Sequence, residues 1–158
     1  MSGRITAKDI MTERLTTLRP ETDVYEAIDR LLKSKISGAP VVDAEGKLIG
    51  VLSEIDCINR LVQAAHEGAP TGSVEAFMSR DTKTIGPTAD LLTIAHLFTH
   101  NTFRRLPVVD DDSVLLGQIS RRDLLAAFNK VLHGGSNHEP QLLYLSALFG
   151  RGDHPIHR

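Results

Sequence analysis

Two short stretches of this chain place a serine three residues before an aspartate, directly after an apolar run. They are GVLSEID, from Gly50 to Asp56, and GQISRRD, from Gly117 to Asp123. An aspartate in the first turn of a helix can accept two hydroxyl hydrogen bonds, as a ribose diol would offer. The free backbone N–H groups of the same turn favour an anion. The residue types and their spacing therefore suit a nucleoside or a nucleotide.

The same residues also have a purely structural explanation. Glycine bends or ends a strand, serine caps the helix that follows, and an aspartate in the first turn complements the helix dipole. This explanation needs no ligand. The two interpretations stay open at this point.

The two stretches belong to a longer internal repeat. An offset of 67 residues takes Gly50 onto Gly117 and, without a gap, Met11 onto Met78 and Pro40-Val-Val-Asp onto Pro107-Val-Val-Asp. Such self-similarity predicts two copies of one structural unit. We place the copies at residues 5–65 and 72–132, joined by a Gly- and Pro-containing linker at 66–71 and followed by a tail at 133–158.

Each copy is expected to fold as strand, helix, strand, strand, helix. In the first copy the strands are expected at 14–20, 39–43 and 47–53, and the helices at 21–35 and 54–66. The second copy repeats this order, so the fold class is α/β, in the α+β sense. Because one such unit buries little apolar surface, the two should pack together around an aliphatic core.

The composition excludes several classes of protein. The formal net charge of −2 argues against a nonspecific nucleic-acid binder, which usually carries a basic excess. Cys57 is the only cysteine, so neither an intrachain disulfide nor a cysteine metal cluster is possible. We see no signal peptide and no apolar run long enough to span a membrane, so a cytoplasmic protein is expected.

The chain resembles a tandem pair of cystathionine-β-synthase (CBS) domains, often called a Bateman module. The resemblance covers about residues 5–132 and is carried by DIMT and AFMS at the openings, by APVVD and LPVVD, and by the two serine–aspartate stretches. It implies two βαββα repeats packed as a pseudo-two-fold pair, which commonly dimerises. It also implies a sensing role without catalysis, with AMP, ADP, ATP or S-adenosylmethionine bound in clefts between the repeats.

The resemblance further implies which residues bind the adenosyl ligand. Asp56 and Asp123 would hold ribose hydroxyls, and Ser53 and Ser120 would contact ribose or phosphate. The residues that would frame the adenine or lie near the same clefts are Gly38, Ala39, Leu106, Val108, Thr17 and Thr84.

The two clefts are not expected to be equal. In the second copy Arg121 and Arg122 stand between the serine and the aspartate, where the first copy has Glu54 and an isoleucine. Arg105 precedes the second Pro-Val-Val, where the first copy has Gly38. Since arginine forms charge-assisted hydrogen bonds with phosphate, the second cleft is expected to take a phosphorylated ligand. The first would suit an adenosine-like or zwitterionic ligand, or none.

Other features carry less chemistry. His96 and His100 have the spacing of a metal-binding pair on a helix, but no acidic or cysteine partner is spaced to complete a site, so no metal is expected. We interpret Cys57 as a structural thiol. In the tail, an apolar helix is expected at 141–149, docked on its own module, on a dimer mate or on a partner protein.

The sequence thus favours a stand-alone regulatory module that binds an adenosyl ligand, forms a homodimer and signals to a partner protein. Two alternatives remain. One is a structural dimerisation module with vestigial clefts, which fails to bind any adenosyl ligand. The other is a small enzyme acting on nucleotides, against which the chain shows no nucleophile beside a base and no P-loop.

Overall fold

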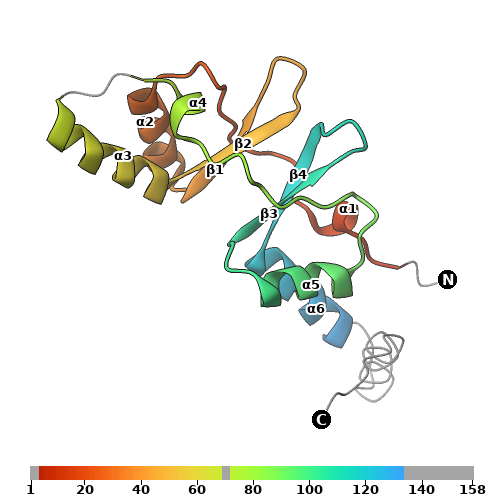
Figure 1. The fold of residues 1–158 in the computed structure, drawn as a ribbon. Coiled ribbons are helices and arrows are strands. Elements are labelled where there is room, and N and C mark those ends of the chain that lie inside the picture. The colour runs from red at the N-terminus through yellow and green to blue at the C-terminus, as the bar shows by residue number, and fades with distance from the viewer. Residues whose placement is uncertain (1–3, 69–71, 134–158) are drawn as a thin grey trace, which may run out of the picture.

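The computed structural model describes residues 4–68 and 72–133 (Figure 1). The tail beyond His133, with its expected helix, lies outside the described residues, and so does part of the linker. The helices are α1 (Ala7–Ile10), α2 (Val24–Ser34), α3 (Glu54–Glu67), α4 (Val74–Phe77), α5 (Leu91–His100) and α6 (Arg121–His133). The strands are β1 (Gly38–Val42), β2 (Leu48–Ser53), β3 (Arg105–Val109) and β4 (Leu115–Ser120). The fold is the expected α+β pair of repeats.

Each repeat is built around an antiparallel hairpin, β1–β2 in the first and β3–β4 in the second. The aspartate of each Pro-Val-Val-Asp motif makes the turn. The Oδ1 atom of Asp43 accepts hydrogen bonds from the backbone N–H groups of Glu45 and Lys47, at 3.0 and 2.9 Å. Asp110 repeats this arrangement in the second hairpin. These aspartates therefore have a structural role.

The strands expected at 14–20 and 81–87 form only one bridging residue each. The N–H of Leu18 donates to the Pro40 carbonyl, and the Leu18 carbonyl accepts from the N–H of Val42. Lengthening this parallel ladder in either direction would need an N–H from Pro40 or from Pro20, and proline has none. The second repeat has the same bridge at Ile85 and prolines at the same places.

The helix expected at 21–35 begins at Val24 and ends at Ser34. Asp23 caps α2, its Oδ1 accepting from the backbone N–H groups of Tyr25 and Glu26. Val24, Ala27 and Leu31 of this helix are buried, and the last two belong to the core of the first repeat. In the second repeat, α5 buries Leu91 and Phe98 in the same way.

The two repeats exchange their opening segments (Figure 1). Helix α1 of the first copy packs against β4 and α6 of the second, while α4 of the second copy packs against α3 of the first. After α1, Thr12 exchanges two backbone hydrogen bonds with Gln118 of β4. After α4, Ser79 does the same with Val51 of β2. Each sheet is thus completed by a residue of the other copy.

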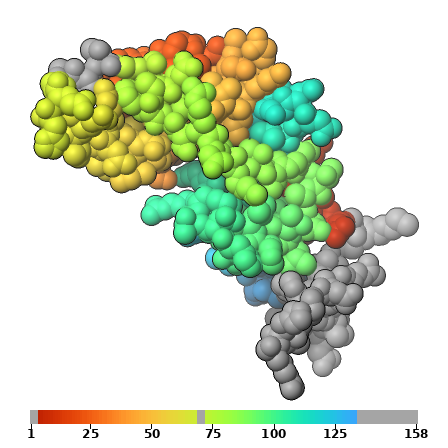
Figure 2. Space-filling model, in the orientation of Figure 1, coloured from red at the N-terminus to blue at the C-terminus, as the bar shows by residue number. Residues whose placement is uncertain are grey.

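The hairpin tips also meet across the pseudo-two-fold axis. The N–H of Leu48 donates to the Ser113 carbonyl, and the N–H of Leu115 donates to the Gly46 carbonyl. The space-filling view shows these tips in contact (Figure 2). The 67-residue offset relates Leu48 to Leu115 and Gly46 to Ser113, so it turns each of these hydrogen bonds into the other. The internal repeat of the sequence is therefore also a symmetry of the fold.

No helix within residues 4–68 and 72–133 is long and apolar enough to cross a membrane.

The glycine that opens each repeated stretch is required by the exchanged segment. A Cβ on Gly117 would lie 2.7 Å from the Met11 sulfur and 2.9 Å from the Thr12 carbonyl. We expect Gly117→Ala to lower the free energy of unfolding by about 1–3 kcal/mol, because the inserted methyl overpacks the sheet edge. Gly86→Ala, where nothing lies within 4 Å, is the control and should change it little. Equal urea midpoints for the two variants would contradict this account of the glycine.

Candidate functional site

The repeated serine and aspartate form a capping box at the start of each closing helix. At α3, Asp56 Oδ2 accepts from the Ser53 backbone N–H at 2.8 Å and from its hydroxyl at 2.7 Å, while the Asp56 N–H donates to Ser53 Oγ. At α6, Ser120 and Asp123 exchange the two backbone–side-chain bonds, at 2.8 and 3.1 Å. The structural explanation of the motif is therefore confirmed.

The capping box uses only one oxygen of each carboxylate. Asp123 Oδ1 has no hydrogen-bond partner in the part of the chain that the structure describes, and the same is true of Asp56 Oδ1. A free carboxylate oxygen accepts hydrogen bonds only, and it is suited to hydroxyl donors such as those of a sugar. The structural role of the motif and its expected ligand role are compatible.

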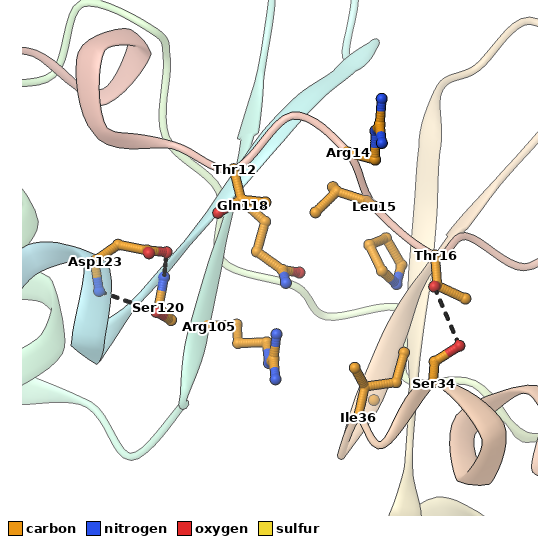
Figure 3. A pocket seen from close by; sticks show the side chains of 12 residues that line it. Thr12, Arg14, Leu15, Thr16, Ser34, Ile36, Arg105, Gln118, Ser120 and Asp123 are labelled. Carbon is orange, nitrogen blue, oxygen red and sulfur yellow. Dashed lines mark hydrogen bonds between the residues drawn. The ribbon is translucent and has the colours of Figure 1, made fainter.

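A cleft of about 210 Å³ lies between the two repeats, with Asp123 and Ser120 at one end (Figure 3). The opening segment of the first copy, helix α2, strand β1 and the second repeat all contribute to its wall. The lining residues are Thr12, Arg14, Leu15, Thr16, Ser34, Ile36, Gly38, Pro40, Arg105, Gln118, Ser120 and Asp123. Four of the expected site residues are brought together here: Gly38, Arg105, Ser120 and Asp123.

Strand alternation selects which side chains reach this cleft. Arg105 pairs with Ser120, and Gln118 is two residues before Ser120 on β4, so all three lie on one face of the second sheet. Gly38 and Pro40 hold the corresponding positions on β1. The two sheets thus contribute facing walls, of which the second is the more polar.

Two cations of the cleft have no partner within residues 4–68 and 72–133. Arg14 and Arg105 make no ion pair or hydrogen bond through their side chains with any described residue. The guanidinium of Arg105 extends into the cleft, away from Asp123 (Figure 3). Arg14 lies at another edge of the cleft, apart from Arg105 (Figure 3). A free carboxylate oxygen and guanidinium groups without a partner among the described residues suit a ligand that carries both an anion and hydroxyl groups.

Three residues expected to frame an adenine lie elsewhere. Ala39, Leu106 and Val108 are 1%, 0% and 0% exposed and belong to the two hydrophobic cores. They alternate along β1 and β3 with the residues that face the cleft, so their side chains point to the opposite side of the sheet. These side chains therefore do not line the cleft, whereas Gly38 and Pro40 do, and a contact of Ala39, Leu106 or Val108 with an adenine stays a prediction.

Arg121 and Arg122 do not line the cleft either. They are the first two residues of α6 and are exposed, while Asp123 folds back on the cap. The Arg121 guanidinium donates to the Thr102 carbonyl at 3.4 Å, and neither arginine pairs with Asp123 among the described ion pairs. The cations of the cleft are instead Arg105 and Arg14, and the sequence analysis missed the second of these.

The remaining expected residues stay outside this cleft. Thr17 and Thr84 do not line it, but Thr16 does, with its hydroxyl 3.4 Å from that of Ser34. Ser53 and Asp56 lie in the first repeat. There the 67-residue offset places Asp81 at the position of Arg14 and Val51 at the position of Gln118. The surroundings of Asp56 are therefore less cationic.

Two other candidates from the sequence have ordinary surroundings. The rings of His96 and His100 stack at 4.0 Å, and no group of three or more potential metal ligands occurs within residues 4–68 and 72–133. Cys57 is 5% exposed in the core of the first repeat. Burial, followed by the charges of Asp56 and Glu54, raises the pKa of this thiol above its usual value.

Comparison with known sequences agrees with this architecture. The profile of the CBS domain matches residues 7–63 and 74–130. The uncharacterized protein MJ1225 of Methanocaldococcus jannaschii is 33% identical over 118 residues, covering 75% of this chain and 41% of its own length. The inosine-5'-monophosphate dehydrogenase of Aquifex aeolicus is 32% identical over 143 residues, which is 90% of this chain and 28% of the enzyme. The chain thus spans less than half of either relative.

Solved structures show the same fold. CBSX2 of Arabidopsis thaliana in complex with AMP has a TM-score of 0.70 at 31% identity, covering 80% of this chain and 97% of CBSX2. The CBS domain pair of protein MJ0100, in complex with 5-methylthioadenosine and S-adenosyl-L-methionine, has a TM-score of 0.68 at 25% identity. It covers 80% of this chain and 98% of that pair.

The raised pKa of Cys57 predicts slow alkylation. Only the thiolate reacts, so the rate of modification by iodoacetamide should be far lower in the folded chain than in urea at pH 8. It should still be rising with pH above about 10, where a free thiol is already largely ionised. Because Cys57 is the sole cysteine, the labelled fraction measured by mass spectrometry reports this thiol alone. A folded-state rate that levels off near the usual thiol pKa would contradict the assignment.

Proposed function

The chain belongs to the CBS domain family, and we propose that it is a regulatory protein that binds an adenine nucleotide in the cleft at Asp123. One observation carries the proposal: the cleft combines a carboxylate oxygen of Asp123 with the guanidinium groups of Arg14 and Arg105, none of which has a partner among the described residues. The carboxylate would accept the ribose hydroxyls and the arginines would bind the phosphate. The AMP complex of CBSX2 supports this class of ligand.

Related adenosyl ligands remain within the proposal, since the pair from MJ0100 binds 5-methylthioadenosine and S-adenosyl-L-methionine. The charges of this chain favour the nucleotide. Three charged side chains line the cleft, Arg14, Arg105 and Asp123, so its formal charge is +1. A dianionic phosphate gains more from that surplus than a sulfonium ligand does. The binding expected of Ser53 and Asp56 stays a prediction, with weaker affinity for phosphate.

The position of the cleft provides a route to signalling. Ile36, Gly38 and Pro40 come from the first repeat, and Arg105, Ser120 and Asp123 from the second. A ligand that contacts both walls favours the arrangement in which the two sheets are correctly spaced, so its binding energy is coupled to the relative position of the repeats. We propose that a partner protein responds to that change. The cytoplasmic location stays a prediction, because the Arabidopsis protein CBSX1, a relative, is chloroplastic.

The expected homodimer is supported by the outer surface of the first repeat. Helix α3 exposes Ile55, Ile58 and Val62, at 58%, 53% and 55% of their surface, and Leu32 of the neighbouring α2 is 70% exposed. The spacing of the three α3 residues places them on one helical face. An apolar face of this kind is typical of an interface. We propose that two copies pair through it.

Removal of the Asp123 carboxylate should abolish tight nucleotide binding. We expect Asp123→Ala to weaken AMP binding at least roughly 100-fold in calorimetric titration, because two hydrogen bonds to a charged acceptor are lost, at about 1.5–3 kcal/mol each. Asp56→Ala is the matched control. It removes the same capping box from the other repeat and should lower stability similarly while leaving the strongest AMP site intact.

A wild-type chain that binds neither AMP, ATP nor S-adenosylmethionine would overturn the proposed function. Loss of AMP binding in Asp56→Ala but not in Asp123→Ala would move the nucleotide to the other repeat.

A charge on the exposed face of α3 should separate the dimer. We expect Ile58→Lys to elute as a monomer in size-exclusion chromatography with light scattering, because an uncompensated ammonium cannot be buried in an apolar interface. Leu125→Lys changes the equivalent position of the second repeat, which is 70% exposed, and should leave the dimer intact. A monomeric wild-type chain, or a dimer that survives Ile58→Lys, would contradict this interface.

A further inference from the structure

Gln118 is a largely buried residue whose side chain is polar. Thr22 and Gln118 are the polar residues buried in the described part of the chain, at 9% and 8% exposed. The Thr22 hydroxyl accepts a hydrogen bond from the Arg19 N–H. The side-chain amide of Gln118 has no hydrogen-bond partner among the described residues. It extends from β4 into the cleft (Figure 3).

The fold itself does not need this amide. The backbone of Gln118 exchanges two hydrogen bonds with Thr12, at 3.0 and 2.9 Å. The equivalent residue, Val51, exchanges the same two bonds with Ser79 through an apolar side chain. The amide nitrogen and oxygen are not fully buried themselves, so they reach the open space of the cleft, and the fold at the equivalent position of the first repeat is made with valine. The amide can meet a partner only within the cleft that it lines.

We propose that Gln118 is a specificity-determining residue of the cleft and that its amide hydrogen-bonds the polar edge of the ligand's base. This inference rests on the proposed function. A glutamine amide offers one donor beside one acceptor, which matches the amino group and the neighbouring ring nitrogen of adenine.

The neighbours of Gln118 assign it to the base and not to the other groups of the nucleotide. The cations Arg14 and Arg105 are available to the phosphate, and the Asp123 carboxylate to the ribose. Gln118 and Ser120 lie on the same face of β4, about 7 Å apart at two residues per pleat. The amide is thus one step along the strand from the residues that would hold the sugar. Leu15, Ile36 and Pro40 supply apolar surface for the ring in the same cleft.

The test pairs a protein variant with a ligand variant. AMP is compared with purine riboside 5'-monophosphate, which differs only in lacking the 6-amino group. We expect the wild-type chain to bind AMP about tenfold or more tightly than this analogue, in the range of one bidentate amide–base contact. Gln118→Val, which installs the residue of the first repeat, should lose that preference and bind both ligands about as weakly as wild type binds the analogue.

Stability separates a ligand contact from a structural role. Without ligand, Gln118→Val should unfold at about the same urea concentration as wild type, because the amide makes no hydrogen bond with a described residue and the equivalent strand position already holds a valine, Val51. Gln118→Met keeps the length of the side chain but lacks the amide, so it should lose the preference as well. It checks that the result for Gln118→Val does not come from altered packing. Val51→Gln is the control and should leave the preference of the Asp123 cleft unchanged.

Several outcomes would overturn the inference. They are a wild-type chain that binds AMP without preferring it over the analogue, and a Gln118→Val or Gln118→Met variant that keeps the preference. A third outcome is that both variants change the ratio of the affinities for AMP and adenosine but not the ratio for AMP and the analogue. Gln118 would then contact the phosphate, and the inference would be overturned as well. A wild-type chain that binds no nucleotide would contradict the proposed function itself, so the two failures are distinguishable.

Discussion

The exchange of opening segments holds the rest of the structure together. Thr12 pairs with Gln118 in the second sheet, and Ser79 pairs with Val51 in the first, through two backbone hydrogen bonds each. These bonds fix the two sheets face to face and bring Arg14 and Thr16 of the opening segment to the wall of the cleft. The same close approach explains why both copies have glycine at this position, Gly50 and Gly117. A side chain at either position would collide with the methionine of the exchanged segment. The cleft is a consequence of this pairing, since neither repeat forms its wall alone.

The serine and aspartate of the repeated stretch have two compatible roles. One oxygen of Asp123 closes the capping box of α6 and so holds the carboxylate at a fixed place at the end of the cleft. The other oxygen stays available to a ligand. A carboxylate fixed in this way loses little side-chain freedom on binding, which is the advantage of building a binding residue into a helix cap. The same box at Asp56 has less cationic surroundings, so identical backbone geometry leads to sites of different strength.

Much of the fold could be predicted from the sequence, because the offset of 67 residues and the helical and strand periods are local signals. The strands expected at 14–20 and 81–87 form only one bridge each, because proline lacks the N–H that a longer ladder would need. The prolines are visible in the sequence, but their effect depends on the register in which the strands pair.

The site was only partly predictable. Asp123, Ser120, Arg105 and Gly38 line the cleft as expected, but Arg14 and Gln118 were missed, since nothing local shows that the opening segment crosses to the other repeat. Arg121 and Arg122 were favoured by their neighbours in sequence, yet helix geometry turns them outward.

The structure of the chain crystallised with AMP would test the central claim most directly. The account predicts one well-ordered nucleotide in the cleft between the repeats, with its ribose hydroxyls donating to Asp123 Oδ1 while Oδ2 still caps α6, and with its phosphate near Arg105 and Arg14. An AMP molecule bound elsewhere would contradict it, and so would one in this cleft whose ribose makes no contact with Asp123.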